Sequence, residues 1–576
     1  MASREERQIK GDGRTQSGIE VKELYGPEDV AELVYQQDIG RPGAYPFTRG
    51  SYPRMYRERL WVDAQPALGG STPYVKEKGL VSSQYLGRLL SDGVSSGGIR
   101  SGGDYHNLAT VDPDHPLVRY DVGGCGGASY SLWQMLEGNE RILPKLVRRS
   151  LDEGYVIEFG HQVGTADVCD FTRYLALMEV QGWDSKKFRG NMVNDPLTSH
   201  ITGCMKYKQP LEVGFRVSCD AQEYAYRNLP LYRPTNGGCA YDLRESGIDT
   251  FQELAFRFGN FVEYADEMVR RGLKFEEFGS QPAIALSAEI DFFETICKLR
   301  AVRRMWARLG RERYGADTAK MKCPPVSTNS AGNSMTQQQQ VFNVVRQTIE
   351  TMASVLGGVN GMELKGYTEA VSPPTTEAYV INAGIQRIIA AETNACLTAD
   401  PLGGSYYVEW MTDHIEKNSM QLLRQILDKG GIRACIRSGW IQGEVERAAQ
   451  ARAKELEEKR KIRVGVNLYQ ELASYDIPLP QFDFARGKPG APYTKKQLHD
   501  LEVWNTFKRS RDLDKVKPAL GNLFHTAQRG ENVVRPMVEA WKAYASIGEI
   551  MGSIRQALGF PYDQFEMVGK PEWLSY

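Results

Sequence analysis

The central part of the chain repeats one pattern of hydrophobic and polar positions. A short apolar or β-branched run comes first, then a turn that contains glycine or asparagine, and then a long stretch with apolar residues at helical spacing. In 250–271, for example, Leu254, Phe258, Phe261 and Met268 share one face of a helix. Strands that alternate with helices in this way indicate βαβ units and a parallel sheet.

The same pattern gives bounds for individual elements. The expected strands are 155–159, 188–193 and 282–286, and the expected helices are 170–182, 250–271, 291–313, 336–356, 375–393 and 532–558. Thr250 and Glu253 have the spacing of a capping box. Because several such units follow one another, we expect an α/β fold with a closed (β/α)8 TIM barrel rather than an open sheet.

The two ends of the chain depart from this pattern. The stretch to about Gly43 is polar and weakly periodic, as in an arm, while 444–463 is charged and is interpreted as a solvated helix face. A Pro- and Gly-rich stretch at 478–492 is interpreted as a linker, after which helical patterns resume. We therefore expect an N-terminal arm that admits the substrate (1–60), a barrel (61–465), and a linker with a C-terminal helical extension (466–576).

Composition and charge exclude several classes of function. Lys and Arg number 71 against 72 Asp and Glu, which argues against nucleic acid as a partner because phosphate binding needs a basic surplus. No apolar run is long enough to cross a bilayer, and the charged N-terminus does not resemble a secretory signal. The nine cysteines form no CxxC pair and the seven histidines show no zinc spacing. We expect a cytoplasmic protein that binds no metal of its own.

Two glycine tracts are candidates for close backbone contact with a ligand. They are SSGGIRSGG at 95–103 and GGCGGAS at 123–129. Neither has the spacing of a dinucleotide-binding or phosphate-binding loop, so flexible loops are the simpler interpretation.

Several longer motifs carry a resemblance to a known family. They are IGRPGAYPFTRGSYPRMY (39–56), KLRAVRRMW (298–306), NVVRQTIETMASVLGG (343–358), DPLGGSYYVE (400–409) and ENVVRPMVEAW (531–541). From about residue 35 to 560 the chain resembles the methylmalonyl-CoA mutase family of adenosylcobalamin-dependent acyl-CoA mutases. Its layout is similar to the separate large subunit of isobutyryl-CoA and 2-hydroxyisobutyryl-CoA mutases.

The resemblance implies an isomerase that performs a radical carbon-skeleton rearrangement with adenosylcobalamin (coenzyme B12). It also implies a flavodoxin-like module with a DxHxxG motif whose histidine ligates cobalt. Asp104, Tyr105 and His106 begin like that motif, but Ala109 occupies its last position. We therefore expect no cobalamin-binding domain in this chain, and a small partner subunit that ligates the cobalt in a heterodimer or heterotetramer.

Five cofactor positions carry over from the resemblance. Glu245 matches the glutamate that meets the corrin amides, and Asn329 and Gly332 match positions that face the corrin. Glu369 and Ala370 match the pair near the ribose and the ring. A carboxylate suits a ribose because it accepts hydrogen bonds from two hydroxyls.

The coenzyme A side of the resemblance is less faithful. Tyr52, Met55 and Arg59 match residues that contact the coenzyme A tail, with Arg59 as the phosphate contact. The family's later arginine falls on Gln281, and its serine neighbour falls on Ala283.

The reacting centre departs most from the family. Tyr241 is kept, but the family's histidine, which donates a hydrogen bond to the thioester carbonyl, is Asp242 here. An ionised aspartate only accepts. Three alternatives follow: Asp242 is protonated by burial, it meets a donor on the substrate, or it is structural and paired with Arg244 or another base.

The remaining substrate positions point to a different acyl group. Gln65 is retained between Ala64 and Pro66, the substrate-facing glutamine is Val193, and the arginine that clamps the free carboxylate of methylmalonyl falls on Gly203. We take Asp242, Tyr241 and Gln65 as the catalytic set. We expect an acyl group that is bulkier or less charged than methylmalonyl.

Two other functions stay open from the sequence. Gln281 and Ala283 also fit a B12-dependent mutase whose substrate is not carried by coenzyme A, in the manner of glutamate mutase. The loss of the histidine also fits a non-catalytic barrel that binds a cobalamin protein or a coenzyme A ligand.

Overall fold

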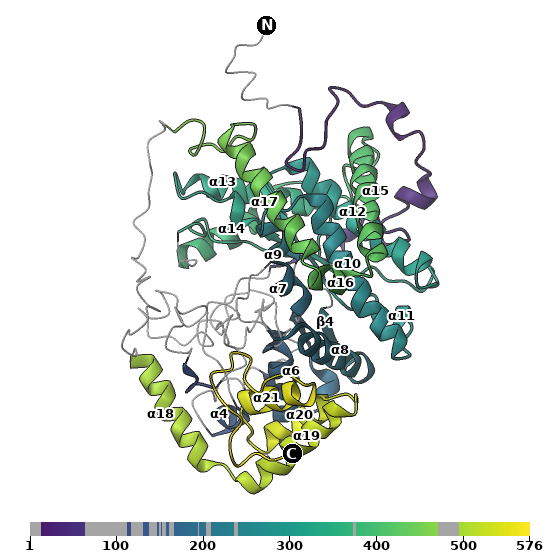
Figure 1. Cartoon of the computed structure of the whole chain (residues 1–576). Helices are drawn as coiled ribbons and strands as arrows, with labels where there is room; N and C mark the ends of the chain where they lie inside the picture. Colours follow the sequence, from purple (N-terminus) through teal and green to yellow (C-terminus); the bar gives the residue numbers. More distant parts are fainter. Residues whose placement is uncertain are drawn as a thin grey trace. The chain divides into compact units, whose positions relative to one another are not determined.

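The computed structural model in Figure 1 describes most of the chain. The described residues are 13–63, 112–116, 131–137, 144, 147–148, 151–152, 157–159, 166–193, 195–202, 209–235, 240–371, 376–470 and 495–576. They fall into two compact units: Met1–Pro66 with Gly237–Pro480, and Ala67–Asn236 with Gln481–Tyr576. Each unit thus combines segments that are distant in the sequence.

The first unit contains a four-stranded parallel sheet in the order β1-β7-β6-β5. Its strands are β1 (Val62–Asp63), β5 (Ile284–Ala288), β6 (Val326–Ser330) and β7 (Gly361–Glu363). Its helices are α9 (Ala240–Glu245), α10 (Thr250–Arg270), α11 (Phe275–Phe278), α12 (Phe292–Glu312), α13 (Phe342–Leu356), α14 (Thr376–Glu392), α15 (Tyr406–Asp428), α16 (Ile432–Arg437) and α17 (Trp440–Glu457). Helices α10, α12 and α15 lie side by side (Figure 1).

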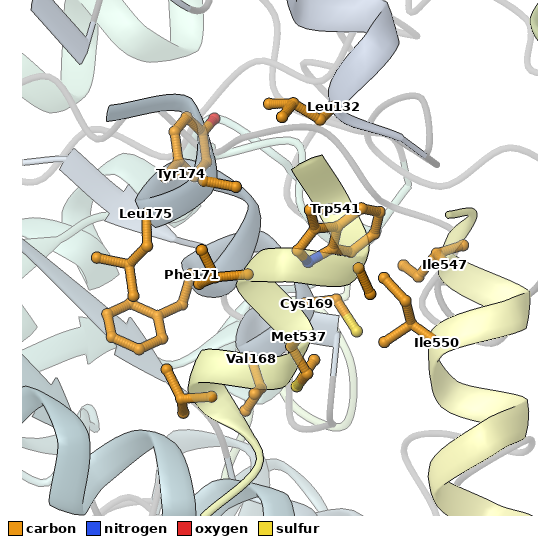
Figure 2. Close-up of a cluster of buried hydrophobic side chains, with 14 of the residues drawn as sticks. Leu132, Val168, Cys169, Phe171, Tyr174, Leu175, Met537, Trp541, Ile547 and Ile550 are labelled. Atoms are coloured by element: carbon orange, nitrogen blue, oxygen red, sulfur yellow. The ribbon is translucent and has the colours of Figure 1, made fainter. Parts of the chain in front are cut away.

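The second unit contains a three-stranded parallel sheet of β2 (Ile157–Phe159), β3 (Gly190–Val193) and β4 (Tyr232–Thr235). Its helices are α4 (Leu132–Leu136), α6 (Ala166–Val180), α7 (Pro196–Thr202), α8 (Leu211–Asn228), α18 (Lys495–Ser510), α19 (Leu513–Gln528), α20 (Val534–Lys542) and α21 (Ile547–Ala557). Figure 2 shows its core, where Trp541 lies between α6 and α21. The indole Nε1 of Trp541 donates to Thr172 Oγ1 at 2.9 Å, which satisfies the one polar group of this buried ring.

The expected α/β class is confirmed, because parallel strands alternate with helices in both units. The three expected strands coincide with β2, β3 and β5 to within two residues. The eight-stranded barrel and the three-part division of the chain remain predictions. The expected linker at 478–492 and both glycine tracts lie outside the described residues.

Two local expectations were wrong. The cap of α10 is Asp249, whose carboxylate accepts from the backbone of Gln252 at 2.8 Å, one residue before the expected capping box. The expected helix 532–558 is two helices, because Tyr544 has a positive φ of 64° and Ser546 caps α21.

The basic motif KLRAVRRMW lies on α12 and is buried. Lys298 Nζ lies 2.6 Å from Glu253 Oε2 of α10, and both side chains are almost fully buried. Arg300 pairs with Asp400 and with Glu409 of α15. Each of these two buried cations has an acidic partner from another part of the chain. The motif therefore joins α12 to its neighbours rather than to a ligand.

Among the described helices, none has both the length and the apolar character needed to cross a bilayer.

Candidate active site

The carboxyl ends of β5, β6 and β7 meet at one edge of the four-stranded sheet. Ser287 of β5 is opposite Asn329 of β6, which in turn is opposite Glu363 of β7. Because the strands are parallel, the residues that follow them, such as Glu289 and Gly332, gather at the same edge. This is the edge at which α/β proteins commonly bind ligands.

Gly332 lies at the centre of a polar cradle. A Cβ atom at this position would lie 2.9 Å from Tyr241 Oη, 3.2 Å from Glu245 Oε2 and 3.6 Å from Glu369 Cγ. Four residues predicted from the sequence therefore converge here: Tyr241, Glu245, Gly332 and Glu369, which we call the Gly332 cradle. Two further predicted site residues, Asp242 and Ala370, directly follow Tyr241 and Glu369 in the chain.

Glu245 is the best-defined acid of the cradle. Its Oε2 accepts from the backbone N–H of Asn333 at 2.7 Å, whereas its buried Oε1 has no hydrogen-bond partner among the described residues. Burial, with the nearby charge of Glu289, raises the pKa of Glu245 to about 8. At neutral pH the carboxyl is therefore mostly protonated and can donate as well as accept.

Asn329 presents a second unsatisfied group. Its side chain is buried, and its Nδ2 has no hydrogen-bond partner in the described part of the chain. A buried amide without a partner is costly, so a polar ligand with carbonyl groups would stabilise it.

The environment of Tyr241 and Asp242 is rich in acids. Tyr241 is buried, and burial together with the charges of Glu245 and Glu369 raises its pKa well above the ordinary value. Asp242 is half-buried beside it. The guanidinium of Arg244 lies 3.0 Å from Glu289, a salt bridge buried on both sides. Burial opposes ionisation of Glu289, yet Arg244 and Arg452 hold its pKa at about 2.

Lys365 belongs to the site and was missed from the sequence. Its Nζ lies 4.5 Å from the ring centroid of Tyr241 and 3.2 Å from Glu363 Oε1. Its backbone N–H donates to Ser330 Oγ at 2.8 Å, which fixes the start of the turn after β7. This lysine begins the segment KGYTEA (365–370), which also contains the matched Glu369 and Ala370, and that proximity in sequence was the available signal.

Arg452 and Arg463 were also missed. Arg452 Nη2 donates to Asn333 Oδ1 at 2.9 Å, and Arg463 Nη1 donates to the carbonyl of Ser334 at 2.8 Å. Both lie in the charged run that was interpreted as a solvated face. That interpretation is wrong for these two residues, since a charge pattern does not reveal which arginines of a charged segment turn inward.

The residues expected to contact coenzyme A lie at the other end of the sheet. Ser51 Oγ donates to Asn360 Oδ1 at 2.9 Å and Tyr56 Oη donates to the carbonyl of Val359 at 2.9 Å, both just before β7. Gln281 lies just before β5. The amino ends of the strands are therefore flanked by the arm and by Gln281.

Among the residues expected to contact coenzyme A, Arg59 is exposed, and its guanidinium lies 4.5 Å from the ring centroid of Tyr52. Met55 is buried. The Oε1 atom of Gln281 is buried without a hydrogen-bond partner among the described residues. An exposed guanidinium held on an aromatic face suits a phosphate contact.

The remaining predicted site residues lie outside the described residues or belong to the second unit. Gln65 and Gly203 lie outside the described residues, as do Ala64, Pro66 and the DYH segment at 104–106. Val193 ends β3 in the second unit, opposite Thr235 of β4. Among the described residues, no three His, Cys, Asp or Glu side chains are arranged to share a metal ion.

The fold is α/β, and its candidate site lies at the carboxyl ends of parallel strands. A sequence model described as methylmalonyl-CoA mutase matches residues 14–560. The chain belongs to the methylmalonyl-CoA mutase family.

Individual relatives agree with this assignment. The chain is 30% identical over 541 residues to the 2-hydroxyisobutanoyl-CoA mutase large subunit of Aquincola tertiaricarbonis, covering 94% of this chain and 91% of that protein. It is 29% identical over 546 residues to methylmalonyl-CoA mutase of Rhizobium meliloti (strain 1021), covering 95% and 72%. It is 26% identical over 548 residues to mitochondrial methylmalonyl-CoA mutase of Homo sapiens, covering 95% and 68%. These relatives are mutases, which are isomerases.

Proposed function

We propose that the chain is the large, substrate-binding subunit of an adenosylcobalamin-dependent acyl-CoA mutase that performs a radical 1,2-rearrangement. The observation that carries the proposal is the Gly332 cradle, where Tyr241, Glu245 and Glu369 meet a glycine with no room for a side chain. The family in general depends on adenosylcobalamin.

The cradle fits such a cofactor. Asn329 Nδ2 and Glu245 Oε1 are buried and unpartnered in the described part of the chain, and a corrin edge carries amides that both donate and accept. Glu369 would accept from ribose hydroxyls, with Ala370 beside it. When bound, adenosylcobalamin supplies the radical chemistry, while these residues orient it and exclude water.

We propose a small partner subunit that carries the DxHxxG motif and ligates the cobalt. The support is the relative from Aquincola tertiaricarbonis, which is named a large subunit and is covered over 91% of its length. We place the pair in the cytoplasm, because the nine cysteines show no paired spacing typical of a disulfide framework.

The two ends of the sheet favour a coenzyme A thioester over a free acid. The cradle and the Tyr52–Arg59 segment flank opposite ends of strands β5 to β7, and a five-residue strand is about 17 Å long. An extended acyl-CoA would reach from one end to the other, whereas a small free acid would leave the arm and Gln281 without a role.

A closed barrel would provide the required path along the strands. The first described strand, β1, pairs in parallel with the last, β7, as closure of a (β/α)8 barrel requires. This pairing supports the barrel as the framework of the proposed function.

The charges of the site favour an acyl group that carries hydrogen-bond donors. Asp242, Glu363 and Glu369 surround Tyr241, and Lys365 is the cation closest to its ring among the described residues. A second carboxylate on the substrate would be repelled. We propose a hydroxyl- or amino-substituted acyl-CoA, with Asp242 accepting from the substituent, rather than methylmalonyl-CoA.

Co-purification tests the proposed function. The tagged chain, isolated from its native extract with adenosylcobalamin added, should bring down a small protein with a DxHxxG motif and retain cobalamin. The Glu245→Ala variant should lose cobalamin while keeping the partner. Absence of both partner and cobalamin with the unaltered chain would favour the non-catalytic barrel instead.

A further inference from the structure

Helix α17 is held against the site by an unusually close backbone contact. A Cβ atom at Gly247, just after α9, would lie 2.9 Å from the Cα atom of Ala449 in α17. Gly247 also has a positive φ of 104°, so a glycine is needed here for two reasons. Arg452 follows Ala449 by three residues and therefore lies on the same face of α17.

Arg452 reaches two groups of the site from this position. Its Nη2 donates to Asn333 Oδ1 at 2.9 Å and lies 3.5 Å from Glu289 Oε2. The other side of Asn333 is also held, because its Nδ2 donates to Glu289 Oε1 at 3.3 Å. Both ends of the Asn333 amide are thus fixed by charged groups.

Asn333, whose side chain is held in this way, is also hydrogen-bonded to Glu245 of the cradle. Its backbone N–H donates to Glu245 Oε2 at 2.7 Å, and it follows Gly332 directly. Glu289, which completes the network, is itself held by Arg244 at 3.0 Å. The orientation of Glu245 therefore depends on a residue of α17 that does not itself touch Glu245.

We propose that Arg452 is a positioning residue of the cofactor site, which acts through Asn333 to hold Glu245. The inference rests on the proposed function, since it is the cofactor that Glu245 would meet. Sequence patterns do not point to it, because α17 is rich in charged residues and its fully buried residues are Ile441 and Val445.

Several charges face Glu245. Glu289 raises its pKa, whereas Lys365 and Arg452 lower it. Arg463 and Glu350 also interact electrostatically with Glu245. Loss of Arg452 should therefore shift the titration of Glu245 to higher pH in addition to freeing Asn333.

The test on the full chain is an infrared titration. The difference spectrum between the unaltered chain and Glu245→Gln isolates the protonated carboxyl of Glu245, with a midpoint expected near the pKa of about 8. Arg452→Met should raise that midpoint. Arg452→Lys keeps the positive charge, so its midpoint should stay close to that of the unaltered chain. Arg447→Met is the matched control, because Arg447 lies on α17 but is exposed and pairs with Glu444 of the same helix. If Arg452→Met is unstable, Asn333→Ala breaks the same link from the other side.

A second readout uses the complex with the co-purified small subunit. Arg452→Met should weaken retention of adenosylcobalamin by about tenfold, the loss of one charge-assisted hydrogen bond, and Arg447→Met should not. An unshifted midpoint in Arg452→Met, or an equal shift in Arg447→Met, overturns the inference. If the unaltered complex retains no cobalamin, the proposed function fails, while the midpoints still decide whether Arg452 positions Glu245.

Discussion

The hydroxyl of Tyr241 lies against the backbone of Gly332, so closely that a Cβ at position 332 would start 2.9 Å from the phenolic oxygen. Real Cβ atoms do not approach a neighbour this closely, so any side chain here must displace Tyr241 or the nearby Glu245. The contact joins a residue matched to the reacting centre to one matched to the corrin face. It explains why both belong to one site although they are 91 positions apart, from 241 to 332.

Gly332→Ala should therefore damage the site more than the fold. Overpacking of this kind typically costs about 1–3 kcal/mol, and we expect a lower melting temperature with a loss of cobalamin retention in the complex. Gly384→Ala is the control, because Gly384 lies in α14 with open space at its Cβ position. That variant should be neutral or slightly stabilising. Equal effects of the two substitutions on cobalamin retention would contradict the cradle.

Asp242→Asn should discriminate among acyl groups. If Asp242 accepts from a hydroxyl or an amine of the substrate, loss of its charge removes about 1.5–3 kcal/mol, or about 10- to 150-fold in kcat/KM. The effect should appear with 2-hydroxyisobutyryl-CoA and be small with isobutyryl-CoA, measured as product formed by the reconstituted pair. An equal loss with both substrates would instead make Asp242 structural.

Lys365→Met should lower both activity and stability. The buried Glu363 would lose its cation, which typically costs about 3–5 kcal/mol, and Tyr241 would lose the charge over its ring. The double variant Lys365→Met with Glu363→Gln should recover the melting temperature but not kcat. Recovery of both would show that Lys365 only balances Glu363.

The raised pKa of Glu245 predicts a pH dependence of stability. Its pKa is about 8 in the folded chain and near the ordinary 4.5 when unfolded, so its contribution is fully present below pH 4.5 and is lost as the pH rises to about 8. The loss is at most about 1.4 kcal/mol per pH unit. Relative to the unaltered chain, Glu245→Gln should therefore gain melting temperature between pH 5 and 8 and level off above, a trend that a solvated carboxylate would not give.

The buried pair of Lys298 and Glu253 predicts a large effect on stability. Lys298→Met should destabilise the first unit by about 3–5 kcal/mol, because Glu253 would keep a buried charge. Lys320→Met is the control, since Lys320 pairs with Asp317 at the surface, where a salt bridge contributes about 0–1 kcal/mol. Thermal melts of the two variants provide the comparison; similar melting temperatures would show that the α12 pair is not needed for packing.

Periodicity predicted the elements well where apolar positions recur regularly. Strand β5 and helices α10 and α12 appear within two residues of their expected bounds. It failed at 532–558, where the apolar positions continue across a break that depends on the backbone of Tyr544. Hydrophobic spacing does not register a single residue with positive φ.

The site was predictable only where motifs matched residue by residue. Glu245, Gly332 and Glu369 were named from matched motifs, and the structure brings them together. Lys365 and Arg452 were not, because each becomes part of the site only through the fold. A lysine after a strand and an arginine in a charged helix look the same as many solvated residues.

The most direct test of the account is electron paramagnetic resonance of the complex with adenosylcobalamin and its co-purified partner. Mixing with 2-hydroxyisobutyryl-CoA should produce a paramagnetic signal, while the corresponding free acid should produce none, because only the thioester spans the sheet from the arm to the cradle. A signal with free acids alone would contradict the assignment of this chain as an acyl-CoA mutase subunit. The absence of a signal with both thioesters and free acids would contradict it as well.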